Sequence, residues 1–340
     1  MTTAAVPHHW FIACEATELR GRPIARTIQD TPLVLFRDGD GRAAALLDRC
    51  PHRNVPLSAG RMTDGLLQCS YHGWRFDGSG VCRLVPALAS EPDRKARRAT
   101  MYPAVEQDGF VWVYSTPDVT PIREPYRFPT VDGRYATIRR SVTMPGPMRH
   151  ALENALDVPH TAFLHSGLFR TAERRNDIEV RIHRDANGAE AEYVGEPRPS
   201  GVVGRVLSPG GGVVEHFDRF IMPCIAQVEY RLGDSSHLLN TSAMTPVSPT
   251  ETTVWAVIQL RLPVPGRLVA PLITPIAMRI LRQDSSILRL QAKAIERFDG
   301  EDFTSTEIDV LGPHIWKLLA AASDGADAPA PFEHRVTMRV

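Results

Sequence analysis

Two short arms of the chain each offer one thiol and one imidazole at a spacing suited to a metal centre. Cys50 and His52 are followed, after sixteen residues, by Cys69 and His72. Zinc fingers place two cysteines before two histidines, whereas here the order alternates. Each arm can therefore give its cysteine to one iron and its histidine to the other, as in a [2Fe–2S] cluster with two imidazole ligands. Because neutral imidazoles replace thiolates, such a cluster has a potential of roughly −150 to +300 mV and accepts electrons readily.

The residues around these four candidates resemble the Rieske [2Fe–2S] family. The resemblance is carried by four stretches, Cys50-Pro-His-Arg53, Pro56-Leu-Ser58, Tyr71-His-Gly-Trp74 and Phe76-Asp-Gly78. Ser70 stands where the family usually has proline. It adjoins a ligand without being one, so we expect only a small change in hydrogen bonding at the cluster. A structural zinc site is the alternative interpretation, but zinc does not account for so extended a match.

A second group of candidate ligands follows in a stretch with helical composition, residues 148–164. Asp157 and His160 lie three residues apart and share a helical face. His165 lies five residues further, about 140° around an ideal helix, and reaches that face only if the helix bends near Pro159. Two histidines and one carboxylate form the facial triad that holds Fe(II) and leaves positions open for O₂ and substrate. In an arbitrary protein, two histidines capping a helix end would be the better interpretation, but the preceding Rieske pattern favours iron.

Over residues 8–320 the chain is similar to the Rieske non-haem iron oxygenases, specifically to an oxygenase (α) component that stands alone as a monooxygenase or demethylase. The resemblance implies that His160 and His165 bind the mononuclear iron. The third ligand of the family lies far downstream, in a helix often reading Asp-x-x-Ile/Val-Leu, and Asp284 begins such a pattern here. The alternative for this residue is an ordinary acid near a helix N-terminus. Weaker candidates for the third ligand are Glu153 and Asp302.

The same resemblance assigns roles to two residues beside the iron. Asp157 matches the carboxylate that links the iron of one subunit to the Rieske centre of its neighbour, through the histidine that matches His72. Asn154 matches a position commonly found beside the iron. In the family the two centres of a single subunit lie too far apart for direct transfer. The resemblance therefore implies a head-to-tail ring, and we expect a homotrimer.

The order of strand, turn and helix signals predicts an α+β protein with two domains. Residues 8–115 read as short strands and hairpin turns, a β-rich [2Fe–2S] domain whose loops carry the cluster ligands. The proline-rich residues 116–130 are expected to form a linker. Residues 131–325 are expected to form a catalytic domain of antiparallel sheet with flanking helices, of the helix-grip type. Residues 326–340 are expected to be a loosely held tail.

The pattern of the second domain predicts three helices and several strands. Helices are expected over residues 148–164, broken near Pro159, over 274–297, and from a capping box at Thr304-Ser-Thr-Glu307 toward Ala321. Strands are expected over residues 178–183, 190–194, 217–231 with an interruption near Pro223, 236–244 and 252–262.

The composition argues against several classes of partner and location. Lys plus Arg and Asp plus Glu number 39 each in 340 residues, so no net field favours nucleic acid or anionic membranes. The start of the chain lacks the basic and apolar segments of a signal peptide. Five cysteines include two cluster candidates, and the other three, Cys14, Cys82 and Cys224, do not resemble a disulfide framework. A reducing cytoplasm is therefore the expected compartment.

The stretch 262–281 is mostly apolar but contains Arg267, Arg279 and four prolines, which does not fit a membrane-spanning helix. We interpret it as a proline-interrupted segment of a soluble protein, with peripheral membrane contact as an alternative. Its apolar residues precede Asp284 and fit either an ordinary buried helix or the wall of a pocket for a lipophilic substrate. These residues are Leu268, Val269, Leu272, Ile273, Ile276, Met278 and Ile280.

Together these features predict a terminal oxygenase that uses O₂, a Rieske [2Fe–2S] cluster and mononuclear Fe(II). We expect its electrons to come from NAD(P)H through a ferredoxin, a flavin reductase or both. The apolar stretch favours hydroxylation or demethylation of a hydrophobic substrate, with a sterol-like or polycyclic lipid oxidised at a methyl group as the first choice. One alternative is an O- or N-demethylase of a small aromatic acid. The other, of a different class, is a Rieske electron carrier, which would leave the second domain unexplained.

Overall fold

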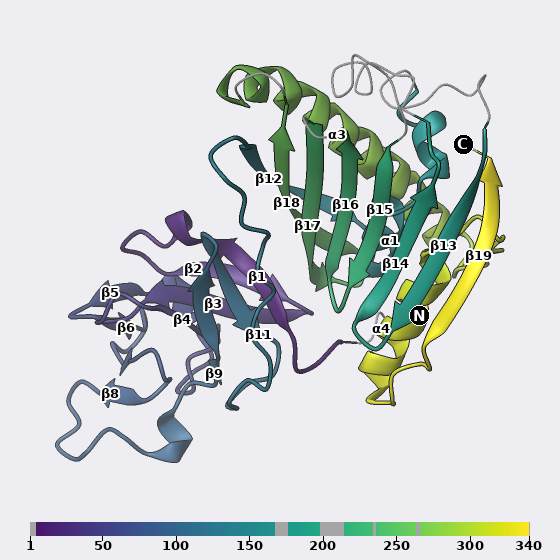
Figure 1. Cartoon of the computed structure of the whole chain (residues 1–340). Helices are drawn as coiled ribbons and strands as arrows, with labels where there is room; N and C mark the ends of the chain where they lie inside the picture. Colours follow the sequence, from purple (N-terminus) through teal and green to yellow (C-terminus); the bar gives the residue numbers. More distant parts are fainter. Residues whose placement is uncertain (1–4, 167–175, 198–213, 234–235, 263–265, 340) are drawn as a thin grey trace. The chain divides into compact units, whose positions relative to one another are not determined.

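The structure, a computed structural model, describes residues 5–166, 176–197, 214–233, 236–262 and 266–339 (Figure 1). The chain divides into two compact units, Ala5–Phe128 and Pro129–Val340. The boundary falls within the proline-rich segment 116–130, where the fixed φ angles of proline stiffen the chain. Each unit has its own sheets and is described separately.

The first unit is built from three small antiparallel sheets. One contains β1 (Trp10–Glu15), β11 (Phe110–Tyr114) and β10 (Ala104–Gln107). The second contains β2 (Ile24–Ile28), β3 (Thr31–Arg37), β4 (Ala43–Leu47) and β9 (Met101–Tyr102). The third contains β5 (Arg61–Thr63), β6 (Leu66–Gln68), β7 (Arg75–Phe76) and β8 (Cys82–Leu84). Short 3-10 turns are η1 (Ala16–Glu18), η2 (Leu57–Ala59) and η3 (Lys95–Arg97).

The predicted hairpins of this unit are confirmed. β3 pairs with β4 across residues 38–42, and β10 pairs with β11 across residues 108–109. The candidate ligands Cys50 and Cys69 are themselves core residues, packed with Leu57, Leu67 and Phe76. The apolar core therefore fixes the position of both thiols.

The second unit is an eight-stranded antiparallel sheet with helices packed against it (Figure 1). Its strands, in spatial order, are β12 (Ala136–Pro145), β18 (Glu251–Arg261), β17 (Ser236–Ser248), β16 (Ile225–Leu232), β15 (Glu215–Ile221), β14 (Gly188–Val194), β13 (Asp177–Asp185) and β19 (Phe332–Arg339). The helices are α1 (Met148–Ala155), the 3-10 turn η4 (Pro159–Ala162), α3 (Gly266–Arg297) and α4 (Gly312–Asp324). Because α1 contacts the helices α3 and α4 as well as the strands β17 and β18, it belongs to a layer of helices packed on the sheet. The predicted α+β class is confirmed.

Three local predictions for this unit are wrong. The capping box at 304–307 does not start the last helix, since α4 begins at Gly312; the backbone N–H and hydroxyl of Thr306 bond to Asp309 in a local turn instead. The segment before residue 274 is helical, because the exposed Pro271 and Pro275 lie within the first three turns of α3 and break few backbone hydrogen bonds. The tail from residue 326 is not loosely held, since β19 pairs with β13 over eight residues.

The remaining strand predictions are confirmed, and the interruption near Pro223 separates β15 from β16. The strands pair in register from β13 to β18, apart from one shift between Pro246 and Ser248 of β17, so residues at matched positions point to the same face. Among the described residues no helix is long and apolar enough to span a bilayer.

Candidate metal centres

The two cysteine–histidine arms of the first unit are tight loops. The arm at Cys50 is closed by the Cys50 N–H, which donates to the carbonyl of Val55 at 2.9 Å. The arm at Cys69 connects β6 to β7, and the Cys69 N–H donates to the carbonyl of Trp74 at 2.8 Å. Its turn needs the positive φ of Gly73, +70°, which glycine adopts without a steric cost. Backbone hydrogen bonds thus position both thiols before any metal binds.

The imidazoles of the two arms lie next to each other. The ring centroids of His52 and His72 are 4.5 Å apart, and His52 stacks on Trp74 at 4.7 Å. In the described part of the chain, His52 Nδ1 is buried and has no hydrogen-bond partner. Burial lowers the pKa of His52; burial, together with the neighbouring Cys69, raises the pKa of Cys50 to about 11. A neutral imidazole with a free lone pair beside two buried thiols fits a Rieske cluster, whose binding displaces the thiol protons.

The second group of predicted ligands also comes together. His160 lies in η4, His165 lies just beyond it, and Asp284 projects from α3. The two histidine Nε2 atoms are 3.3 Å apart, and Asp284 Oδ1 lies 3.0 Å from His165 Nε2 and 3.7 Å from His160 Nε2. Ligand atoms at about 2.1 Å from one ion, on one face of an octahedron, are about 3.0 Å apart. The three side chains therefore fit a single metal ion.

The bend that this arrangement needs is present. α1 ends at Ala155, and Pro159 opens η4, so the chain turns before it presents His160. The bend near Pro159, predicted as the condition for His165 to reach the same face, is thus confirmed. Its physical cause is that proline cannot continue the hydrogen bonding of α1.

Charge in this group favours a cation. Burial lowers the pKa of His160, but the carboxylates of Asp157 and Asp284 outweigh it and raise that pKa to about 9. Burial raises the pKa of Asp284, but its hydrogen bonds to His160 and His165 lower it overall. The group therefore holds positive charge between two carboxylates, and a divalent cation can take the place of the proton.

Gln283 is a supporting residue that the sequence reasoning missed, although it directly precedes Asp284. Its Oε1 lies 3.1 Å from His165 Nδ1, so that nitrogen carries the proton and donates. The lone pair of His165 Nε2 is then directed toward His160 and Asp284. The sequence signal that could have identified Gln283 is a polar residue directly next to a predicted ligand on a helix.

Replacing Gln283 by leucine should lower the affinity for mononuclear iron by about 10- to 100-fold, because the partner that fixes the His165 tautomer is lost. Iron retained by the purified protein across a series of chelator concentrations measures the effect. Gln283→Glu keeps an acceptor at the same place and serves as the control. Equal retention by the leucine variant and the wild type would show that Gln283 has no orienting role.

The other predicted residues of this group lie at the edge of the triad or away from it. Asp157 Oδ2 lies 3.5 Å from His160 Nδ1. Asn154 lines both hollows that adjoin the triad. The weaker candidates do not join the triad: the carboxylate of Glu153 accepts a hydrogen bond from Trp316 Nε1 at 3.1 Å, and Asp302 is exposed in a loop.

A cavity of about 160 Å³ adjoins the triad, between the helices α1 and α3 and the strands β12 and β15–β18. Much of its wall is apolar, and of the apolar stretch 262–281 it includes Ile280 and Leu281. Its polar groups outside the triad and α1 come mainly from the sheet. The sheet contributes His216, Asp218, Tyr230, Asn240 and Ser242.

A second, open groove of about 860 Å³ adjoins the triad at His160 and is lined in part by Asp157. Three large apolar side chains on this groove are exposed to solvent, Phe163, Ile287 and Leu290. Exposed apolar groups gathered in one place are typical of a surface that contacts another protein. We call this surface the apolar groove.

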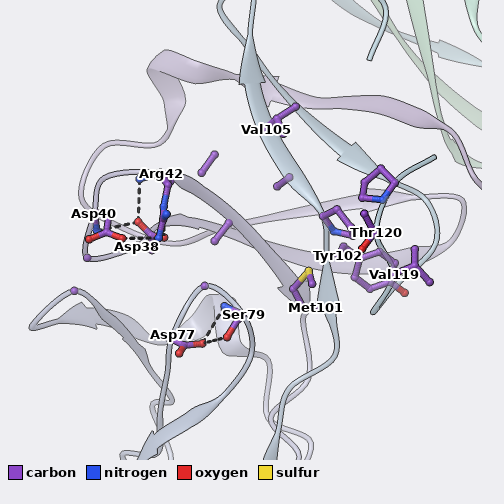
Figure 2. Close-up of a pocket in the computed structure, with 18 of the residues that line it drawn as sticks. Asp38, Asp40, Arg42, Asp77, Ser79, Met101, Tyr102, Val105, Val119 and Thr120 are labelled. Atoms are coloured by element: carbon purple, nitrogen blue, oxygen red, sulfur yellow. Dashed lines mark hydrogen bonds and ion pairs between the residues drawn. The ribbon is translucent and has the colours of Figure 1, made fainter. Parts of the chain in front are cut away.

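The first unit has a hollow of its own, about 870 Å³, which Figure 2 shows. Two of its acids, Asp38 and Asp77, are occupied in local turns, and Asp64 is paired with Arg75. Asp38 accepts from the backbone of Asp40 and Arg42, and Asp77 accepts from Ser79. These contacts stabilise hairpin turns, so the hollow is no candidate metal site.

Comparisons with known proteins agree with this geometry. A model of the Rieske [2Fe-2S] domain matches residues 9–104, and a model of the vanillate O-demethylase oxygenase C-terminal domain matches residues 144–324. The oxygenase component of dicamba O-demethylase from Stenotrophomonas maltophilia is 31% identical over 253 residues, which cover 71% of this chain and 68% of that protein. The oxygenase subunit of phthalate 4,5-dioxygenase from Pseudomonas putida is 33% identical over 197 residues, which cover 56% of this chain and 42% of the relative.

Solved structures share the fold over nearly the whole chain. Dicamba monooxygenase bound to dicamba superimposes with a TM-score of 0.80 at 22% identity, covering 94% of this chain and 98% of that one. Caffeine-bound NdmA from Pseudomonas putida CBB5 superimposes with a TM-score of 0.78 at 22% identity, covering 93% and 91%.

Proposed function

We propose that this chain, which belongs to the Rieske non-haem iron oxygenases, oxidises a single-ring aromatic compound by removing a methyl group or adding a hydroxyl. The chain is an oxygenase that uses a Rieske [2Fe–2S] cluster, mononuclear iron and O₂. Three of its relatives are named for dicamba, phthalate and 3-chlorobenzoate, which are substituted single rings, while others are named for a flavonoid and for chlorophyllide a. An electron carrier without oxygenase activity does not fit this membership.

The observation that carries the proposal is the size of the cavity beside the triad. About 160 Å³ is close to the engineered cavity of about 150 Å³ that holds one benzene molecule. A sterol has four fused rings and needs considerably more room. The sterol-like lipid expected from the sequence is therefore not supported, and the aromatic alternative fits better.

The apolar stretch that suggested a lipid has another explanation. Ile273 packs against the core cluster of Val214, Leu232, Leu260 and Leu262. The side chains of Leu268, Val269 and Leu272 lie outside the described residues. Ile280 and Leu281 line the small cavity beside the triad, so the described part of the stretch supports neither a larger lipid pocket nor membrane contact.

We propose that Cys50, His52, Cys69 and His72 hold the cluster, and that His160, His165 and Asp284 hold the mononuclear iron. When bound, the cluster supplies single electrons and the iron activates O₂. The protein places the aromatic ring beside the triad and keeps water out with the apolar wall of the cavity. Asn154, which faces the cavity from α1, is proposed to position O₂ or substrate.

We further propose that Asp157 connects this site to the Rieske unit of a neighbouring copy, in a head-to-tail ring that is most simply a homotrimer. Support comes from its place between His160 and the apolar groove, which is open to a partner.

Electrons are proposed to come from a reductase, with or without a ferredoxin. A cytoplasmic location stays a prediction; it agrees with five buried cysteines that form no disulfide.

Turnover of aromatic methyl ethers under ¹⁸O₂ tests the proposed function. The purified enzyme, a Rieske-type reductase, a ferredoxin and NADH would be supplied with ring-methoxylated phenols, ethers and benzoates. O-demethylation consumes O₂, two electrons and two protons, and releases formaldehyde, water and a phenol that keeps its ¹⁶O. Ring hydroxylation instead places ¹⁸O on the ring. Oxygen consumption with neither product, from any aromatic tested, would contradict the proposal.

A further inference from the structure

A buried charged network forms one wall of the cavity. His216 Nδ1 lies 2.6 Å from Glu196 Oε2 and its Nε2 lies 3.0 Å from Asp218 Oδ1. The ring of His216 is stacked between Tyr193 and Tyr230, at 4.2 and 4.0 Å. All three charged side chains are at most 1% exposed. Such packing holds the network rigidly.

The network carries excess negative charge. Burial lowers the pKa of His216, but Asp218 and Glu196 outweigh it and raise that pKa to about 9, so the imidazole is a cation at neutral pH. One cation between two carboxylates leaves one net negative charge. Of the three groups, His216 and Asp218 line the cavity.

Asn240 adds an acceptor to the same wall. Asp218 is paired with Val228 on the next strand, and Val228 with Asn240 on the strand after it. These positions form one row across β15, β16 and β17, so the side chains lie on the same face of the sheet. In the described part of the chain, Asn240 Oδ1 is buried and has no hydrogen-bond partner. A buried acceptor of this kind is costly unless a ligand supplies a donor.

The charges that face the cavity are unsuited to an anion. Among its described lining residues there is no lysine or arginine. The acids there are Asp157, Asp218 and Asp284, and each histidine is already paired with a carboxylate. A benzoate-type carboxylate would lose its hydration and meet Asp218, while the imidazolium of His216 on the same wall is already paired with two carboxylates.

We propose that the substrate is an uncharged aromatic compound with a hydroxyl or N–H group that donates to Asn240, and that the His216 network selects against aromatic carboxylates. This inference rests on the proposed function and narrows its substrate class. It replaces the small aromatic acid of the sequence-based alternative with a neutral, phenol-like molecule.

Matched probes test the proposal on the complete enzyme with its reductase. They are the three positional isomers of methoxyphenol, the corresponding dimethoxybenzenes, which lack the donor, and the corresponding methoxybenzoates, which carry the charge. Formaldehyde release gives kcat/KM for each. The best methoxyphenol should exceed its dimethoxybenzene counterpart by about tenfold or more, and its benzoate counterpart by about 100-fold or more.

Two variants test whether Asn240 and Asp218 cause these substrate preferences. Asn240→Leu should reduce the ratio of methoxyphenol to dimethoxybenzene to about one, and Asp218→Asn should raise the relative kcat/KM of the benzoate by about tenfold or more. Cluster absorption and iron content report whether each variant has folded. If a variant does not fold, the kcat/KM ratios of the wild-type enzyme still test the proposed substrate class.

The possible results distinguish a failure of this inference from a failure of the proposed function. Methoxybenzoates that are turned over as well as methoxyphenols would overturn this inference and leave aromatic demethylation standing. Equal use of methoxyphenols and dimethoxybenzenes would overturn the role of Asn240. Failure of the proposed function itself would show as oxygen consumption without any aromatic product.

Discussion

Replacing His165 by alanine should remove the mononuclear iron and lower turnover by at least about 100-fold, while the absorption of the [2Fe–2S] cluster persists. His165 is 2% exposed, and its Nε2 lies 3.0 Å from Asp284 Oδ1. Alanine offers no donor atom at that point, so two ligands remain where the triad needs three. The cluster should survive because its proposed ligands Cys50 and Cys69 belong to the core of the first unit.

Iron content per chain is the measurement, and it should fall from about three irons to about two. The matched control is His183→Ala, which removes a half-exposed histidine of β13 that faces Glu333 rather than the triad. Loss of both metal signals would indicate a failed fold. Asp284→Asn, which keeps the shape of the ligand, then distinguishes misfolding from a wrong assignment. Full iron retention in both variants would refute the triad.

The cluster arms could be predicted from the sequence because their chemistry is local. Each arm is a loop of a few residues closed by its own backbone, as at Cys69 and Trp74, so residue type and spacing carry the information. Asp284 is more than a hundred residues from His165. It was found through a pattern that resembles the family, not through spacing.

The cavity wall could not be predicted, because it depends on strand register. Asp218 and Asn240 line one cavity only because β15, β16 and β17 pair in one particular alignment. A shift of one residue would turn either side chain to the other face. The volume of the cavity likewise depends on how α3 packs on the sheet. The lipid interpretation failed here, since apolar composition alone does not distinguish a pocket wall from core such as Ile273.

Replacing Asp157 by asparagine should lower turnover by about 100-fold or more, while both the cluster and the mononuclear iron are retained. Asparagine has nearly the same shape but loses the charge that faces His160 Nδ1 at 3.5 Å. If Asp157 links His160 to a neighbouring subunit, this change disturbs electron delivery and leaves the triad intact. The readout is the rate at which the reduced cluster is oxidised in a single turnover with O₂ and a methoxyphenol. Asp302→Asn, which neutralises an exposed acid in a loop, is the control.

A second role for Asp157 makes a different prediction. If it only orients His160, iron affinity should fall by about 10- to 100-fold, and added Fe(II) should restore turnover. A link between subunits predicts no rescue by iron. Mixed rings provide the sharper test: chains that carry Cys50→Ser, which lose the cluster, are assembled with chains that carry His165→Ala. Because only a transfer between neighbours pairs an intact cluster with an intact triad, recovered turnover supports the ring, and its absence in verified mixed rings would rule the link out.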